Sequence, residues 1–130
     1  MPSFPRPSFT YNYQVDIEIN NLKNYKNTAS GRAIPAKSSN RLLIAIWNIA
    51  NLGLQDRNDD NYQLIAEMIS WFDMVALQEV NDNLMGLRSI TQNLSSSFKV
   101  VFSVIYKSKV HYFLDNLHFK SALTKGIKKM

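Results

Sequence analysis

The chain contains no cysteine and no long apolar run. Without cysteine among its 130 residues, it has no disulfide and no thiolate metal site. A bound metal would be held by oxygen atoms or by one of two histidines, His111 and His118. The apolar stretches are far shorter than the roughly 18 residues of a membrane span. Residues 1–7 also do not form the apolar core of a signal peptide. We therefore expect a soluble cytoplasmic protein with no membrane segment.

Acidic residues are in the minority, but the imbalance is not uniform. The formal net charge is +5, made up of +3 in residues 1–40, −3 in residues 41–103 and +5 in residues 104–130. The excess of lysine thus belongs to the C-terminal part, and the middle of the chain is acidic. The overall charge is therefore weak evidence for a nucleic-acid-binding face.

The first 40 residues form an N-terminal arm and linker. Residues 1–9 are rich in proline and phenylalanine and are expected to be extended or disordered. In residues 15–25 the apolar positions alternate at first, which favours a strand, and are then spaced as in a short helix; both alternatives stay open. Residues 27–40 form a polar linker that contains Gly31 and Pro35.

The middle of the chain, residues 41–103, has a clearer pattern of strands and helices. Short apolar runs predict buried strands at residues 41–49, 74–79 and 98–102. Between the first two strands the pattern predicts a turn at Asn51-Leu52-Gly53 and then a helix with an apolar stripe of Leu64, Ile65, Met68, Ile69 and Phe72. A second helix precedes the third strand, with Leu84, Leu87, Ile90 and Leu94 on its inner face and a stop at Ser95-Ser96-Ser97. The expected N-terminal caps are Asp59 or Asp60 for the first helix, and Asp82 or Asn83 for the second.

Asn48 and Glu79 stand at the ends of the first two strands. Alternating strands and helices predict parallel neighbours joined by right-handed crossovers. The carboxyl ends of such strands meet at one edge of the sheet, where open α/β sheets bind ligands. We therefore expect Asn48 and Glu79 to lie side by side. A glutamate with an amide beside it is able to hold a cation or a phosphate.

Two motifs in this region carry a resemblance to a known family. Trp47-Asn48-Ile49, followed after a helix by Leu77-Gln78-Glu79-Val80, resembles the opening of the endonuclease/exonuclease/phosphatase superfamily, which has the DNase I-like fold. The resemblance covers residues 41–103, about half of the chain. The surrounding segments agree with it; they are Asn51-Leu52-Gly53, Leu64-Ile65-Ala66-Glu67, the whole run from Asp73 to Val80, residues 84–94 and Phe102-Ser103.

The resemblance implies a layered α/β (α+β) sandwich of two mixed sheets with helices outside. It implies an enzyme that cleaves phosphodiester or phosphomonoester bonds with Mg²⁺ or Mn²⁺, and here a nuclease-like one acting on DNA or RNA. Glu79 would be a direct metal ligand. Asn48 would help to hold the phosphate or the metal-bound water. Both are the catalytic and metal-site candidates of the chain. The substrate class, which in this family includes inositol phosphates and lipids, is not determined by these residues.

The resemblance stops after Ser103, where residues 104–130 form a divergent basic tail. Family members continue for roughly as long again and supply a histidine, an Asp-x-Asn pair, a further asparagine and a closing Asp-His pair. We expect a truncated, inactive form that contains only the first sheet and its flanking helices. The open face of that sheet would favour self-association. A hairpin between residues 98–106 and 110–114 would cover part of it.

Several other polar groups are candidates for structural roles instead. Asp59-Asp60-Asn61 matches an Asp-x-Asn signature, but it precedes a helix and is better explained by capping. Asp115-Asn116 lacks the intervening residue. His111 and His118 have no setting that indicates a general base. The tail lysines are expected to form a solvated face or a disordered end.

Two alternatives to an enzyme remain. The chain is alternatively a small basic protein that binds nucleic acid or an acidic partner without catalysis, through Lys125, Lys128 and Lys129. It is otherwise a non-functional gene remnant. Binding through lysine would be sensitive to salt and independent of Glu79, whereas a phosphoesterase would depend on a divalent metal. Reading the coding DNA from codon 103 in all three frames would test for a frameshift.

Overall fold

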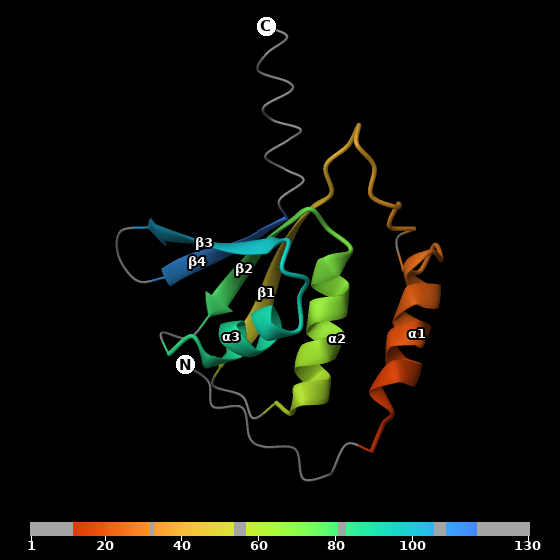
Figure 1. Cartoon of the computed structure of the whole chain (residues 1–130), viewed down its shortest axis with the longest axis horizontal. Coiled ribbons are helices and arrows are strands. Elements are labelled where there is room, and N and C mark those ends of the chain that lie inside the picture. Colours follow the sequence, from red (N-terminus) through yellow and green to blue (C-terminus); the bar gives the residue numbers. More distant parts are fainter. Residues whose placement is uncertain (1–11, 32, 54–56, 81–82, 106–108, 117–130) are drawn as a thin grey trace, which may run out of the picture.

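The protein is a small α+β fold in which a mixed sheet carries helices on one side (Figure 1). A computed structural model describes residues 12–31, 33–53, 57–80, 83–105 and 109–116. Within these ranges it has three helices and four strands. They follow in the order α1 (Val15–Lys26), β1 (Ile44–Leu52), α2 (Asp59–Ser70), β2 (Met74–Val80), α3 (Met85–Gln92), β3 (Phe98–Ile105) and β4 (Lys109–Asn116).

The sheet has the strand order β1-β2-β4-β3. β1 and β2 are parallel neighbours, as the sequence predicts, and Ile44 lies opposite Met74 and Asn48 opposite Gln78. β3 runs in the same direction as β2, but the expectation that it would be the third parallel neighbour is wrong. β4 lies between them and pairs antiparallel with both. The hairpin expected from the sequence is therefore present, and it supplies a central strand.

α1 resolves the choice between strand and helix for residues 15–25 in favour of a helix. Asp16 and Glu18 lie in its first turn and Lys23 and Lys26 in its last, an arrangement that suits the helix dipole. None of its residues is buried. It lies against the side of α2 that faces away from the sheet (Figure 1).

Two of the contacts between α1 and α2 involve lysine side chains of α1. Lys23 Nζ lies 3.7 Å from Glu67 Oε2, and Lys26 Nζ lies 5.4 Å from the centre of the Trp71 ring. Trp71 in turn donates its Nε1–H to Glu67 Oε1 at 2.8 Å. Ion pairs exposed to solvent contribute little stability, so α1 is held less firmly than the other two helices.

α2 begins at Asp59, which is at least one residue earlier than a cap at Asp59 or Asp60 would place its start. The N-cap is Asn58, whose side chain accepts from the Asn61 backbone N–H at 3.0 Å, while the Asn61 side chain accepts from the Asn58 N–H at 3.2 Å. This reciprocal pair is a capping box. The prediction of Asp59 or Asp60 as the cap is therefore wrong. Both carboxylates lie in the first turn, where they still suit the helix dipole.

α3 also begins differently from the expectation. Its N-cap position is Leu84, in the left-handed region with φ 57°, and it makes no side-chain cap bond. Asn83, one of the two expected caps, accepts the Met85 N–H on its Oδ1 at 2.9 Å from just outside the helix. Asp82 lies outside the described residues. The helix ends at Gln92, so Leu84 and Leu94, which were expected on its inner face, lie just outside it.

β1 continues through Leu52, beyond its predicted end at Ile49. Of the three predicted turn residues, only Gly53 lies in a turn, with φ 97°, a conformation that residues other than glycine rarely adopt. Leu52 is fully buried there. Residues 51 and 52 were expected in a turn and belong instead to the strand.

The core lies between the sheet and the pair α2 and α3. Val75 and Leu77 of β2 pack there with Ile69 of α2 and Ile90 of α3, all at most 1% exposed. The remaining buried members are Ile49, Leu52, Tyr62, Ile65, Ala66 and Leu87. Leu64 and Met68, which belong to the predicted α2 stripe, are only partly buried; Tyr62 and Ala66 take those inward positions.

The two faces of the sheet differ sharply in exposure. On β1, Ala45 and Trp47 pack against the core, whereas Ile44 and Ile46 on the opposite face are 57% and 73% exposed. Val101 of β3 is 49% exposed in the same way. Since α2 and α3 cover only the core face, the other face, here called the open face, presents branched apolar side chains to solvent.

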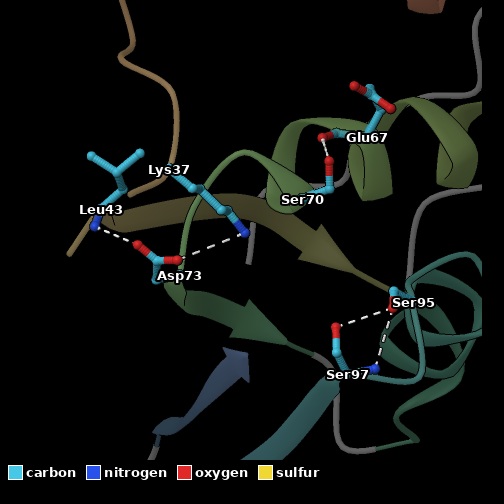
Figure 2. A network of polar contacts seen from close by, with 7 residues as sticks. All are labelled: Lys37, Leu43, Glu67, Ser70, Asp73, Ser95 and Ser97. Atoms are coloured by element: carbon cyan, nitrogen blue, oxygen red, sulfur yellow. Dashed lines mark hydrogen bonds and ion pairs between the residues drawn. The ribbon is translucent and has the colours of Figure 1, made fainter. Parts of the chain in front are cut away.

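Asp73 joins the starting ends of β1 and β2. It is the one buried charged or polar residue of the described chain, at 6% exposure. Figure 2 shows its carboxylate accepting the Leu43 N–H on Oδ2 at 2.8 Å, with Lys37 Nζ 3.9 Å from Oδ1. The Leu43 carbonyl accepts the Asp73 and Met74 N–H groups at 2.8 and 3.2 Å. Burial lowers the pKa of Lys37, and the charge of Asp73 opposes that shift.

Candidate functional site

Asn48 and Glu79 come together at the carboxyl ends of β1 and β2. The Asn48 Nδ2–H donates to Glu79 Oε1 at 2.9 Å. The predicted juxtaposition of these two side chains is therefore present. Asn48 is exposed and Glu79 is partly exposed, so solvent reaches the pair.

A bulge in β1 lies directly beside this pair. Asn48 pairs with Gln78 and Leu52 pairs with Val80, so three residues of β1 stand opposite the single residue Glu79. A bulge bends its strand and redirects the side chains next to it, and bulges are common beside functional sites. The bulge explains how β1 continues to Leu52 although regular pairing ends at Asn48.

Glu79 has a left-handed backbone conformation, with φ 59°. By strict alternation its side chain would follow Val75 and Leu77 into the core, and Asn48 would follow Ile44 and Ile46 onto the open face. The left-handed turn at Glu79 breaks this alternation, so that the carboxylate meets the Asn48 amide. For a residue with a Cβ this conformation costs about 1–2 kcal/mol. Such strain is concentrated at functional sites.

The strain at Glu79 gives a first testable expectation. We expect the free energy of unfolding of Glu79→Gly to exceed that of Glu79→Ala by about 1 kcal/mol. Only glycine adopts this φ without strain. Chemical denaturation of both variants measures the difference. Ala33, with φ 46° in an exposed turn, provides a matched control. Ala33→Gly should give a similar gain without any effect on cation binding. Equal stability of the two Glu79 variants would contradict the assignment of strain.

The donor atoms at this edge fit a hard divalent cation with few protein ligands. Glu79 offers a carboxylate, and because Asn48 donates through Nδ2, its Oδ1 is the amide atom that remains for a cation. Mg²⁺ prefers oxygen ligands and keeps several waters, so one or two protein oxygens suffice. Within the ranges that the structure describes, no three His, Cys, Asp or Glu side chains are grouped as a metal cluster. A divalent cation at this edge would therefore be held by the Glu79 carboxylate and the Asn48 amide oxygen.

The other sequence candidates lie on α2, on β4 or outside the described residues. Asp59, Asp60 and Asn61 form the first turn of α2, and Asn61 takes part in the capping box. Asn61 Nδ2–H also donates to the Tyr13 hydroxyl. His111, Asp115 and Asn116 lie on β4. His118, Lys125, Lys128 and Lys129 lie outside the described residues, so their expected roles stay predictions.

Arg57 is a half-buried cation that sequence reasoning had counted only as charge. It immediately precedes the cap of α2, after the segment that follows β1. Burial lowers the pKa of Arg57, and Tyr62 opposes the shift. An arginine starts from a pKa so far above neutrality that the guanidinium stays charged. In the sequence, the position of Arg57 between the end of a predicted strand and the start of a predicted helix could have marked it as a residue near the carboxyl edge of the sheet.

A small pocket is lined by other residues than the Asn48–Glu79 pair. It has a volume of about 180 Å³ and runs between α1, α2 and the segment after α3. Its lining residues are Ile19, Gln63, Ala66, Glu67, Ser70, Asn93, Leu94 and Ser95. Two polar contacts at its wall, from Ser70 Oγ to the Glu67 carbonyl and between Ser95 and Ser97, appear in Figure 2. None of the sequence candidates lines this pocket.

Comparisons with protein-family models, curated proteins and solved structures find no match to this chain. No helix in the described ranges is both long and apolar enough to cross a membrane. The arrangement of Asn48, Glu79 and the bulge therefore carries the functional interpretation.

Proposed function

We propose that the chain is related to the Mg²⁺-dependent phosphoesterases of the endonuclease/exonuclease/phosphatase type, and that Glu79 is its metal ligand. The observation that carries the proposal is the hydrogen bond between Asn48 and Glu79 at the ends of two parallel strands. A layered DNase I-like sandwich, of which this chain holds the first sheet, is part of the same proposal. The left-handed backbone of Glu79 supports it, because strained backbone conformations cluster at functional sites.

Glu79 and Asn48 would have different roles in this site. Glu79 would hold the cation through its carboxylate, and Asn48 would orient that carboxylate through Nδ2. An asparagine amide also donates to a phosphoryl oxygen without adding charge. The bound Mg²⁺ supplies charge neutralisation and polarisation of a phosphoester. DNA or RNA is the proposed substrate class.

We expect turnover to be absent or very low. Hydrolysis of a phosphoester needs a metal, an activated water and stabilisation of developing charge at one place. The carboxylate and the amide provide metal and phosphate contacts but no general base. A Mg²⁺-dependent hydrolysis of an activated phosphodiester that disappears in Glu79→Ala would contradict this expectation.

Thermal unfolding of the full chain in a Mg²⁺ series tests the metal site. With a dissociation constant on the order of 1 mM, a value typical of weak carboxylate sites, about 10 mM Mg²⁺ stabilises the folded chain by roughly 1.4 kcal/mol. We expect Glu79→Gln to abolish this shift. Asn48→Asp, which adds a second carboxylate, should increase it.

A control separates site binding from a general salt effect. Asp59→Asn removes an exposed carboxylate from the first turn of α2, which is not part of the Asn48–Glu79 pair, and should leave the Mg²⁺ shift unchanged. If Glu79→Gln and the unmodified chain respond alike, the metal site is not at Glu79. If Asp59→Asn alone loses the response, the cation binds at the helix start and the proposal is wrong.

A further inference from the structure

The pocket between α1, α2 and the segment after α3 is large enough for a small organic molecule. Gln63, Glu67 and Ser70 line it from one stripe of α2, because residues three and four apart are neighbours on a helix surface. Its volume of about 180 Å³ is similar to the roughly 150 Å³ of cavities that hold benzene. The chemistry of the lining therefore decides which kind of small molecule the pocket suits.

The polar groups of the lining are mainly left as hydrogen-bond acceptors. Ser70 Oγ–H donates to the Glu67 carbonyl at 2.6 Å (Figure 2), and Asn93 Nδ2–H donates to the Ser89 carbonyl at 2.9 Å. The Ser70 oxygen and Asn93 Oδ1 remain as acceptors. The Gln63 side chain makes no hydrogen bond to any residue that the structure describes, so its amide is also open to a ligand. This lining suits a ligand that donates hydrogen bonds.

Glu67 gives the pocket a negative charge in a fixed position. Its side chain is only 18% exposed, and the Trp71 Nε1–H donates to Oε1 at 2.8 Å, which orients the carboxylate. The second oxygen, Oε2, lies 3.7 Å from Lys23 Nζ, farther than the about 2.7–2.9 Å of a direct charge-assisted hydrogen bond. A carboxylate that is largely removed from water attracts a cation more strongly, because its charge is screened less. Oε2 is therefore the atom to which a ligand cation would bind.

The lysines of α1 show which charge this part of α2 attracts. Lys23 lies beside Glu67, and Lys26 lies over the ring of Trp71. Because Lys23 is 52% exposed, its ion pair contributes little, and a ligand can replace it. A planar amidinium or guanidinium carries several N–H donors in fixed directions, so it can reach Oε2 and a neighbouring acceptor together. Such a group would compete with Lys23 for Glu67.

We propose that this pocket binds a small organic cation that carries a planar amidinium or guanidinium next to an apolar group. The cation would bind Glu67, and the apolar group would pack on Ile19 and Leu94. A neutral amide of the same shape would bind more weakly, since the interaction with Glu67 needs a positive charge. The proposal is independent of the metal site, because neither Asn48 nor Glu79 lines the pocket.

A ¹H–¹⁵N titration of the full chain with benzamidine tests the proposal, with benzamide as the neutral compound of the same shape. We expect benzamidine to shift the backbone amides of Glu67, Ser70 and Ser95 in a saturable way. A ligand of about nine non-hydrogen atoms should have a dissociation constant on the order of 1 mM. Benzamide should bind at least about tenfold more weakly, because it makes no charge-assisted hydrogen bond to Glu67.

Three variants identify the group that binds the cation. Glu67→Gln removes the charge but keeps an oxygen that accepts from Trp71, so it should weaken benzamidine binding at least about tenfold and leave benzamide binding unchanged. Lys23→Met removes the competing cation and should strengthen benzamidine binding about threefold. Asp16→Asn removes an exposed carboxylate of α1 that does not line the pocket, so it should leave both titrations unchanged.

Three results would overturn the proposal. The first is that benzamidine causes no saturable shifts at concentrations up to about 20 mM. The second is equal binding of benzamide and benzamidine, which would mean that the pocket recognises an apolar shape and not a cation. The third is a set of shifts centred on Glu79 that persists in Glu67→Gln, which would place the cation at the edge of the sheet. The spectrum of each variant without ligand verifies that the variant is folded.

Discussion

Gly86→Ala is expected to destabilise the protein by about 2 kcal/mol, although alanine is the better helix former. Gly86 is the second residue of α3, where alanine alone would improve helix propensity. A Cβ at this position, however, would lie 2.8 Å from the Gly53 backbone nitrogen and 2.9 Å from Leu52 Cδ1. Backbone atoms cannot move aside as a flexible side chain can, and Leu52 is fully buried. Chemical denaturation measures the loss.

Ser89→Ala provides the control for this experiment. It lies in the same helix and removes one hydroxyl without adding an atom next to β1. Its effect should stay within about 0.5 kcal/mol. If Gly86→Ala raises stability as helix propensity predicts, the close approach of α3 to the end of β1 is wrong. The result therefore tests how the start of α3 packs beside the bulge that positions Asn48.

Asp73→Ala is expected to cost about 2–3 kcal/mol of unfolding free energy. The substitution removes the acceptor of the Leu43 N–H and leaves Lys37 without its partner. The hydrogen bond dominates, because Asp73 is buried and the bond to Leu43 is 2.8 Å, whereas the 3.9 Å ion pair involves a lysine that is 31% exposed. An equilibrium denaturation curve measures the change.

Two companion variants separate the hydrogen bond from the ion pair. Asp73→Asn keeps an oxygen that accepts from Leu43 and should lose only about 1 kcal/mol. Lys37→Met removes the cation and should change stability by no more than about 1 kcal/mol. If Lys37→Met costs as much as Asp73→Ala, the ion pair and not the Leu43 bond holds the starts of β1 and β2 together.

The sequence predicts the meeting of Asn48 and Glu79 because that meeting depends on simple geometry. Two short apolar runs joined by a helix make parallel neighbours, whose carboxyl ends share an edge. The periodicity also locates α2, α3 and the three strands of residues 41–103 to within a few residues. The hairpin of β3 and β4 follows from two adjacent apolar runs.

The remaining features depend on choices between competing partners. β4 pairs with β2 as well as β3, and this selection is made by contacts distant in the sequence. The N-cap of α2 could have been any of three suitable residues, Asn58, Asp59 or Asp60. Asn58 takes this position because its side chain and that of Asn61 form reciprocal hydrogen bonds with each other's backbone N–H groups. The left-handed turn at Glu79 arises from a register shift against β1, which alternation along β2 alone does not reveal.

Paramagnetic line broadening by Mn²⁺ in a ¹H–¹⁵N spectrum of the full chain tests the central proposal most directly. Mn²⁺ replaces Mg²⁺ at oxygen sites and broadens signals near the bound ion. We expect the first signals to disappear to be the Asn48 side-chain amide and the backbone amides of Glu79 and Val80, and Glu79→Gln to restore them. Broadening that begins at Asp59 and Asp60, or that persists unchanged in Glu79→Gln, would contradict a metal site at Glu79.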